Sequence, residues 1–349
     1  MFKPLNIVCI CLLLVFFSCK VDPKIEEPLV AKRLEEVIPK GWPQPVYTFS
    51  KNVLSDSTFV LGRALFYETL LSKDNTISCG SCHQNFVAFA HAEHRVSHGI
   101  NELEGTRNTP AIFNVTWHPY FMHDGGINHI EVQPLGPITN PIEMAENIGN
   151  VVTKLQSTNK YKQLFKGAFG TDSVTTQRMF RAMAQFMGMM YSYNSKYDYY
   201  KRGENQVQFN DAELRGYNLF IAKCNACHKE PLFSDFQFRN NGLAVNSVYN
   251  DVGRAHITRL ATDTFKFKTP SLRNVTKTGP YMHDGRYTTL EQCLDHYTNG
   301  VKNFVNLDPL LSPNGLQLSA QEKQDIIAFL NTLTDFQFIN DKRFANPNL

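Results

Sequence analysis

The sequence of 349 residues has little net charge of either sign. Its 35 lysines and arginines nearly balance 32 aspartates and glutamates, which leaves a formal net charge of +3. The basic residues are scattered and do not form the clustered stripe that a phosphate backbone requires. We therefore expect no nucleic-acid partner.

The chain also lacks a hydrophobic run long enough to span a bilayer comfortably. The apolar stretch at residues 5–17 has the length of a secretory h-region, and Ser18 and Cys19 follow it in an arrangement that resembles the lipobox of bacterial lipoproteins. We predict a signal peptide at residues 1–18 and a lipidated N-terminus with a tether at residues 19–47. The protein would then be periplasmic and anchored to a membrane through Cys19; a short membrane-spanning anchor is the alternative.

Alternating strand patterns are scarce too, which argues against a β-sheet protein. Apolar residues recur instead at helical spacing within residues 61–72, 176–200, 211–224 and 319–333. These patterns predict an all-α fold.

Cysteine is present in a distinctive arrangement. Of the five cysteines beyond Cys19, four fall in two Cys-x-x-Cys-His motifs, a spacing typical of c-type haem attachment. Two thiols on one turn bond the porphyrin, and the adjacent histidine ligates the iron. Zinc is the alternative for paired Cys-x-x-Cys motifs, but the two histidines and the expected export favour two covalently bound c-type haems. The residues concerned are Cys79, Cys82, His83, Cys224, Cys227 and His228.

Two kinds of sulfur remain outside these motifs. Cys293 has no partner motif, and we expect it to be a buried apolar thiol. A methionine-rich segment could provide haem ligands, but such a helix face more often packs in a core. We therefore predict core positions for Met179, Met183, Met187, Met189 and Met190.

The sequence contains one long internal repeat. Residues 109–133 match residues 269–293 without a gap, 160 positions later, and share Thr-Pro, Asn-Val-Thr, Met-His-Asp-Gly and a glutamate. Each copy follows one Cys-x-x-Cys-His motif. Such self-similarity predicts two cytochrome c-like haem domains related by internal duplication, at residues 48–205 and 206–349.

Eight stretches resemble the bacterial dihaem cytochrome c peroxidases and their MauG-like relatives, in the order that this family has them. The resemblance implies that the N-terminal domain holds a peroxidatic haem and that the C-terminal domain holds an electron-transfer haem. The stretches are residues 61–83, 105–114, 121–144, 193–203, 214–228, 267–275, 280–291 and 295–300.

The resemblance also implies a catalytic pair. The Pro-x-Glu-Met signature of the family is here Pro141 to Met144, so Glu143 would be the catalytic acid and base, with Gln133 as the distal glutamine beside it. Cleavage of hydrogen peroxide needs one proton taken and one delivered, and a single carboxylate can do both. Taken alone, Glu143 could instead stabilise the start of a following helix through the helix dipole.

Two positions in the N-terminal half depart from typical peroxidases of the family. Ile100 stands where those enzymes have a histidine that ligates the peroxidatic iron at rest, which implies an open site. A ligand shifted to His91, His94 or His98 is the alternative, although loop histidines are the simpler interpretation.

The second departure concerns electron transfer between the haems. His123 replaces a tryptophan that lies between the haems in typical members. Imidazole carries an electron hole less well than indole, which leaves direct tunnelling as the alternative. Trp117 lies six residues earlier and is expected in a domain core.

The resemblance implies further ligands in the C-terminal half. Tyr297 aligns with the distal methionine of typical peroxidases, at a position where MauG-like enzymes also have tyrosine. Tyrosinate would stabilise ferric iron, whereas methionine favours ferrous iron. Met282 and His296 are alternative ligands, and Tyr297 could also simply pack on the porphyrin edge.

A calcium ion is also implied, held by Asn108 and the carbonyls of Lys268 and Pro270. Hard cations accept such oxygen ligands together with water. Asn108 as a simple turn residue is the alternative.

Three functions remain open. The first is a cytochrome c peroxidase that reduces hydrogen peroxide to water with electrons from a small cytochrome c or copper protein. The second is a MauG-like enzyme that oxidises residues of a partner protein, and the third is a dihaem electron carrier. Because Glu143 and Gln133 would have no use in a carrier, we expect a haem-dependent oxidoreductase that acts on peroxide.

Overall fold

The structure is a computed structural model that describes residues 34–348. The predicted signal peptide, Cys19 and the first part of the predicted tether lie outside the described residues. No helix of the described part is long and apolar enough to cross a membrane.

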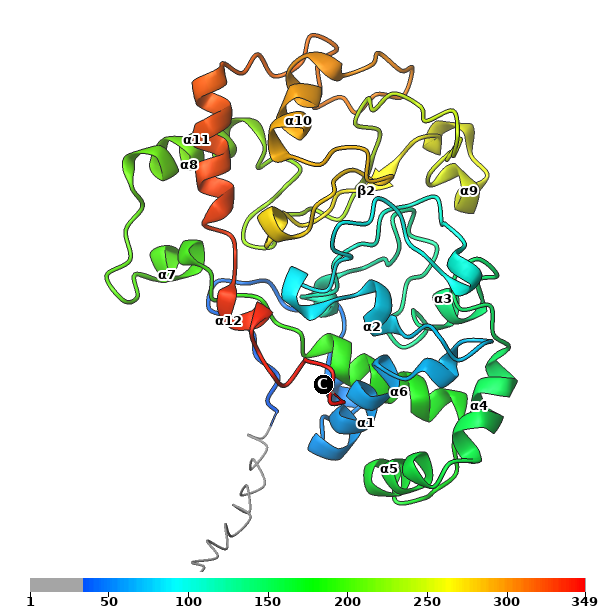
Figure 1. Cartoon of the computed structure of the whole chain (residues 1–349). Helices are drawn as coiled ribbons and strands as arrows, with labels where there is room; N and C mark the ends of the chain where they lie inside the picture. The colour runs from blue at the N-terminus through cyan, green and yellow to red at the C-terminus, as the bar shows by residue number, and fades with distance from the viewer. Residues whose placement is uncertain (1–33, 349) are drawn as a thin grey trace, which may run out of the picture. The chain divides into compact units, whose positions relative to one another are not determined.

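Helices and loops make up nearly all of the described chain (Figure 1). The only sheet among these residues is a two-stranded antiparallel one, in which Phe238 lies opposite Lys268. An all-α fold was predicted, and the described chain is mostly helical, with this small sheet as its strand content. The elements are α1 (Asp56–Phe66), α2 (Cys79–Cys82), α3 (Leu135–Thr139), α4 (Ile148–Gln156), α5 (Asn159–Phe169), α6 (Thr176–Gly188), α7 (Lys196–Arg202), α8 (Asp211–Lys223), β1 (Phe238–Arg239), α9 (Ala255–Thr258), β2 (Phe267–Lys268), α10 (Leu290–Asp295), α11 (Ala320–Asn331) and α12 (Phe336–Ile339).

The predicted helical stretch at residues 176–200 is not one helix. It contains α6 and α7, with a break between them at residues 189–195. Within the break, the main chain of Ser192 makes two hydrogen bonds of 2.9 Å with the side-chain amide of Asn114. These bonds satisfy the main chain without a helix, which explains the interruption.

The two larger hydrophobic cores of the described residues are built mostly from opposite sides of the predicted domain boundary. The first is built around α1 and α6, and the five predicted core methionines are all buried there, at 5% exposure or less. The second surrounds α8 and α11. Phe338 and Phe344, which belong to the predicted C-terminal domain, pack in the first core, so the predicted domains share part of a core.

The helix before each Cys-x-x-Cys-His motif crosses a later helix at a glycine. α1 packs against α6, and α8 packs beside α11 (Figure 1). A Cβ atom on Gly62 of α1 would overlap the carbonyl of Ala182, and one on Gly216 of α8 would overlap the carbonyl of Asp325. Only glycine permits such a close approach of two helices.

The two copies of the repeated stretch have the same local backbone. Asn114 and Asn274 are equivalent, and both adopt the left-handed conformation, with φ of 52° and 57°. Each directly precedes a short 3₁₀ helix. Isolated antiparallel bridges also recur at equivalent places, between Phe121 and Ile127 and between Tyr281 and Tyr287.

The C-terminal part of the predicted tether packs on the folded chain. The rings of Trp42 and Trp117 lie 5.0 Å apart, and the Trp117 indole donates to the carbonyl of Pro43 at 2.8 Å. The guanidinium of Arg273 lies 4.6 Å from the ring of Trp42. Trp117 is 3% exposed, so its predicted core position is confirmed.

Candidate functional site

A cavity of about 820 Å³ is lined by both Cys-x-x-Cys-His motifs. The predicted catalytic pair, two of the candidate ligands of the second haem and the predicted calcium ligands also line this cavity. These residues are Glu143, Gln133, Tyr297, Met282, Asn108, Lys268 and Pro270. The fold therefore brings residues from both halves of the sequence to one continuous space.

The first motif forms the short helix α2, and His83 follows its last residue. The amide of His83 donates to the carbonyl of Cys79 at 2.9 Å. Its Nδ1 lies 2.8 Å from the carbonyl oxygen of Phe89. Because a carbonyl can only accept, Nδ1 carries the proton and Nε2 is left free to bind a metal.

The second motif directly follows α8 and repeats this arrangement. The amide of His228 donates to the carbonyl of Cys224 at 2.9 Å. Its Nδ1 lies 3.1 Å from the carbonyl of Pro270 and 3.3 Å from that of Phe233. The same reasoning leaves Nε2 of His228 free.

These observations fit a c-type haem at each motif. All four motif cysteines are free thiols on the cavity wall. Each motif histidine is oriented through Nδ1 by a main-chain carbonyl, as metal-ligating histidines usually are. The core residues Phe66, Met183 and Met187 also line the cavity, so part of its wall is apolar, as a porphyrin requires.

Glu143 lies in the loop between α3 and α4. The Asn140 side-chain amide donates to Glu143 Oε1 at 3.0 Å, and the Glu143 carbonyl accepts from the amide of Ile100 at 2.8 Å. Since α4 begins at Ile148 with Asn147 as its N-cap, Glu143 does not lie in a first helical turn. The helix-dipole interpretation therefore does not apply.

The surroundings of Glu143 suit an acid and base. Burial raises the pKa of the Glu143 carboxyl, and the hydrogen bond from Asn140 partly opposes this. A carboxyl with a raised pKa can both take and release a proton nearer neutral pH. Gln133, just before α3, lines the same cavity.

Ile100 is buried at 6% exposure. Of the three histidines in the loop before it, His98 lines the cavity. Cys82 lies beside this loop, since its Sγ is 3.4 Å from the carbonyl of His98. Cys293, predicted to be buried, is only partly so and also lines the cavity.

Two candidate ligands meet near the second motif. Tyr297 belongs to a π-helical turn, His296–Gly300, that continues α10. The side-chain amide of Asn241 lies 3.5 Å from the Tyr297 hydroxyl and 3.9 Å from the Met282 sulfur. Both side chains therefore reach the same part of the cavity. His296 is instead buried, with Nε2 3.1 Å from the carbonyl of Asn241.

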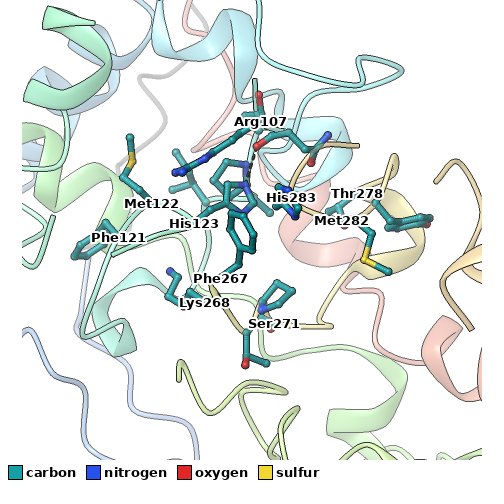
Figure 2. Close-up of a pocket in the computed structure, with 18 of the residues that line it drawn as sticks. Arg107, Phe121, Met122, His123, Phe267, Lys268, Ser271, Thr278, Met282 and His283 are labelled. Atoms are coloured by element: carbon teal, nitrogen blue, oxygen red, sulfur yellow. Dashed lines mark hydrogen bonds between the residues drawn. The ribbon is translucent and has the colours of Figure 1, made fainter. Parts of the chain in front are cut away.

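The repeated stretches cross each other at the cavity. The amide of Asn108 donates to the carbonyl of His283, and the amide of Lys268 donates to the carbonyl of His123, both at 2.7 Å. The two donors, Asn108 and Lys268, occupy equivalent positions 160 residues apart, and so do the two acceptors, His123 and His283. Each copy therefore donates to the other in the same way. Figure 2 shows His123, Lys268 and His283 around Phe267, whose ring stacks on that of His283 at 3.7 Å.

This crossing reaches the histidine of the second motif. His228 donates to the carbonyl of Pro270, two residues after Lys268 in the chain. The main-chain amide of Lys268 in turn donates to the carbonyl of His123. A short route of hydrogen bonds and covalent bonds thus connects His228 with His123.

His123 is also bonded to the first half of the site. Its side chain donates from Nε2 to the carbonyl of Asn108 at 2.8 Å. Pro110, two residues further along the chain, lines the cavity together with His83. His123, which replaces the typical tryptophan, is therefore held by hydrogen bonds to Lys268 on one side and to Asn108 on the other.

An ion-pair cluster fastens the crossing. The Arg107 guanidinium binds both carboxylate oxygens of Asp251, at 2.5 and 2.8 Å, and one oxygen of Asp124 at 2.6 Å. Asp124 belongs to the first repeated stretch, whereas Asp251 comes from the C-terminal half. Burial alone would raise the pKa of Asp251, but Arg107 lowers it below its usual value.

The groups predicted to hold calcium have other contacts. The Asn108 side-chain amide donates to the carbonyl of Arg95 at 3.1 Å, and the carbonyl of Pro270 accepts from the second motif histidine. The ammonium of Lys268, a partly buried residue, donates to the carbonyl of Tyr120 at 2.9 Å. The positive charge of Lys268 beside these groups does not favour a bound calcium ion. The calcium site stays a prediction.

Four residues that shape the site were not predicted from the sequence. Arg107 and Asn140 are close in sequence to predicted residues, which is a usable signal. Asn241 and Asp251 lie in a loop without a recognisable pattern, and only the fold brings them to the cavity.

Known proteins resemble this chain over most of its length. Methylamine utilization protein MauG of Methylorubrum extorquens is 33% identical over 313 residues, which cover 88% of this chain and 86% of that protein. Cytochrome c551 peroxidase of Nitrosomonas europaea is 33% identical over 280 residues, with 79% and 80% covered. A crystal structure of a MauG-like protein associated with microbial copper homeostasis superposes with a TM-score of 0.80 at 32% identity and covers 89% of this chain and 99% of that one.

The family comparison agrees. Residues 56–206 match the sequence model described as di-haem cytochrome c peroxidase. The chain therefore belongs to the family of dihaem cytochrome c peroxidases and MauG-like proteins.

Proposed function

We propose that this protein is a dihaem peroxidase that reduces hydrogen peroxide to water with electrons from a small redox protein. The observation that carries the proposal is the Glu143 carboxyl, with its raised pKa, on the cavity wall that the first motif also lines. Such a carboxyl is the group that peroxide cleavage requires.

Cys79, Cys82 and His83 would hold one haem, and the second motif would hold the other. Bound there, the haems would supply the redox chemistry by taking up and passing on electrons. Glu143 takes a proton from one oxygen of hydrogen peroxide and delivers it to the other. Gln133 donates a hydrogen bond that holds peroxide or water. Two electrons and two protons then convert one peroxide into two waters.

The proposal includes the predicted domain organisation. We assign residues 48–205 to the peroxidatic haem domain and 206–349 to the electron-transfer haem domain, related by internal duplication. The matching helix crossings at Gly62 and Gly216 and the reciprocal bonds of the two stretches support this.

The proposed location is the periplasm, with a lipid anchor on Cys19. The apolar stretch at residues 5–17 and the Ser18-Cys19 pair support export. The electron donor would be a small exported cytochrome c or copper protein.

A MauG-like activity, the oxidation of residues in a partner protein, is the second candidate. Tyr297 favours it, because its side chain lies on the cavity wall where typical peroxidases of the family have methionine. Two relatives are named for MauG. An electron carrier without enzymatic activity is less well supported, since it gives Glu143 no role.

The deciding experiment uses the protein with both haems attached. We expect peroxide-dependent oxidation of a reduced small cytochrome c or copper protein, with two electrons consumed per peroxide. If no reduced donor supports turnover while peroxide oxidises residues of an added protein, seen by mass spectrometry, the MauG-like function replaces the peroxidase.

The oxidised protein should show one high-spin haem without prior reduction. The aliphatic side chain of Ile100 cannot ligate the iron where typical peroxidases have a histidine. Electron paramagnetic resonance of the oxidised protein measures this. Two low-spin signals that change only after half-reduction would transfer the ligand role to His91, His94 or His98.

Changing Tyr297 to Met should raise the reduction potential of the second haem, because tyrosinate stabilises ferric iron more than methionine does. Tyr297→Phe should leave that haem with an open or water-bound position. Spectroelectrochemical titration measures both, with Tyr287→Phe as the control for a neighbouring tyrosine. An unchanged spectrum and potential in Tyr297→Phe would move the assignment to Met282 and strengthen the peroxidase function.

A further inference from the structure

Three histidines that the proposed function does not use lie together after the first motif. The rings of His91 and His94 stack with their centroids 4.0 Å apart. The ring of His98 lies 4.8 Å from that of His94 and 6.2 Å from that of His91. Three imidazoles thus gather within one eight-residue segment, residues 91–98.

Main-chain bonds fix both ends of this segment. Gln84 and Ala90 form an antiparallel bridge directly before His91. At the other end, His98 is bridged to Glu104 in the same way. The backbone positions of His91 and His98 are therefore set by the fold and do not depend on a ligand.

The nitrogens of the cluster are free to bind. His91 is 6% exposed, and its buried Nδ1 has no hydrogen-bond partner. The Nδ1 of His94 donates to the carbonyl of Ala92 at 2.8 Å, which leaves its Nε2 as an acceptor. The Nε2 of His98 lies 3.9 Å from a carboxylate oxygen of Glu104. The Nδ1 of His91 is therefore available to a ligand without loss of an existing hydrogen bond.

We propose that His91, His94 and His98 bind a divalent transition-metal ion, zinc or copper, with Glu104 as a fourth ligand. Imidazole nitrogens together with one carboxylate are typical ligands of both ions, whereas calcium and magnesium prefer oxygen alone. The site is distinct from the two haem irons and goes beyond the proposed peroxidase function.

Binding requires the side chains to turn. Among residues 34–348, no three His, Cys, Asp or Glu side chains are already arranged to hold a metal ion. In the cluster, the rings of His91 and His94 are stacked. Both rings reach one ion only if they rotate out of the stack, since metal–nitrogen bonds are about 2.0–2.1 Å long. The exposed position of His94 leaves room for this rotation.

The test uses the protein with both haems attached, freed of loosely bound metal by a chelator. Titration with zinc and, separately, with copper should show one bound ion per chain in addition to the two irons. With copper, the paramagnetic resonance signal should show coupling to imidazole nitrogens. His91→Gln, His94→Gln and His98→Gln should each weaken binding at least tenfold, while His129→Gln, at an exposed histidine outside the cluster, should not.

Haem content and circular dichroism equal to those of the unaltered protein establish that each variant folds. Equal affinity in all three cluster variants and the control, or no binding of either ion, overturns the proposal. The proposal also falls if His98→Gln converts a low-spin haem into a high-spin one, because His98 would then be an iron ligand. Metal binding and peroxide turnover are measured separately, so either can fail alone.

Discussion

Glu143→Gln should keep both haems and lose most peroxide turnover. The amide has nearly the same shape as the carboxyl, but it cannot take a proton from peroxide and deliver it. Removal of a general acid and base typically lowers the rate by about 10²–10⁴-fold. Steady-state assays with a reduced small cytochrome c measure the effect, and absorption spectra report haem content.

The matched control is Glu102→Gln, which changes an exposed glutamate on the neighbouring loop. Its turnover should stay close to that of the unaltered protein. If Glu143→Gln also keeps its rate within about threefold, far less than loss of a general acid and base produces, Glu143 has no part in the mechanism.

Arg273→Leu should produce the largest loss of stability. Arg273 is 1% exposed, and its guanidinium binds both oxygens of Asp198 at 2.8 Å and the carbonyl of Pro231 at 2.9 Å. Asp198 is itself 3% exposed, so the variant leaves a buried carboxylate without its partner. Breaking one partner of a buried pair typically costs about 3–5 kcal/mol. Urea unfolding at neutral pH measures the change.

The pH dependence provides an internal check. Arg273 lowers the pKa of Asp198 against the effect of burial. Without Arg273, burial raises the pKa of Asp198. As the pH falls from about 7 toward 4, the buried Asp198 carboxylate of the variant takes up a proton, which removes the cost of an unpaired buried charge. The stability difference between the two proteins should therefore narrow in acid.

A surface ion pair serves as the comparison. Lys323 lies 2.6 Å from Asp295, whose side chain is 61% exposed. Lys323→Met should change the unfolding free energy by less than about 1 kcal/mol, because exposed pairs contribute little. If Arg273→Leu and Lys323→Met lost the same unfolding free energy, burial of the Arg273–Asp198 pair would not explain its contribution to stability.

The haem motifs and the repeated stretch were predictable because their chemistry demands fixed spacing. Cys79, Cys82 and His83 must stand at fixed, short spacing in the sequence to bind one haem, so the pattern can be recognised without a structure. Glu143 was different, since the resemblance identified it and its residue type alone did not. Its loop position and the contact with Asn140 became apparent only from the structure.

Other features depend on contacts between distant segments. The break after α6 arises from Asn114, more than seventy residues before Ser192. Phe344 packs in the core of the first half, and no periodicity in its own segment indicates where it will lie. Arg107 pairs with Asp251 through loops, where residue patterns carry little information.

Because the repeated stretches bond to each other, neither copy can finish folding before the other is present. The amide of Asn108 finds its acceptor on His283, and the carbonyl of His123 finds its donor on Lys268. During synthesis, the earlier copy therefore cannot complete its hydrogen bonds until the ribosome has made the later one. A polypeptide interrupted between the copies would keep these groups bonded to water. The two halves should consequently mature as one cooperative unit, even though each has its own haem motif.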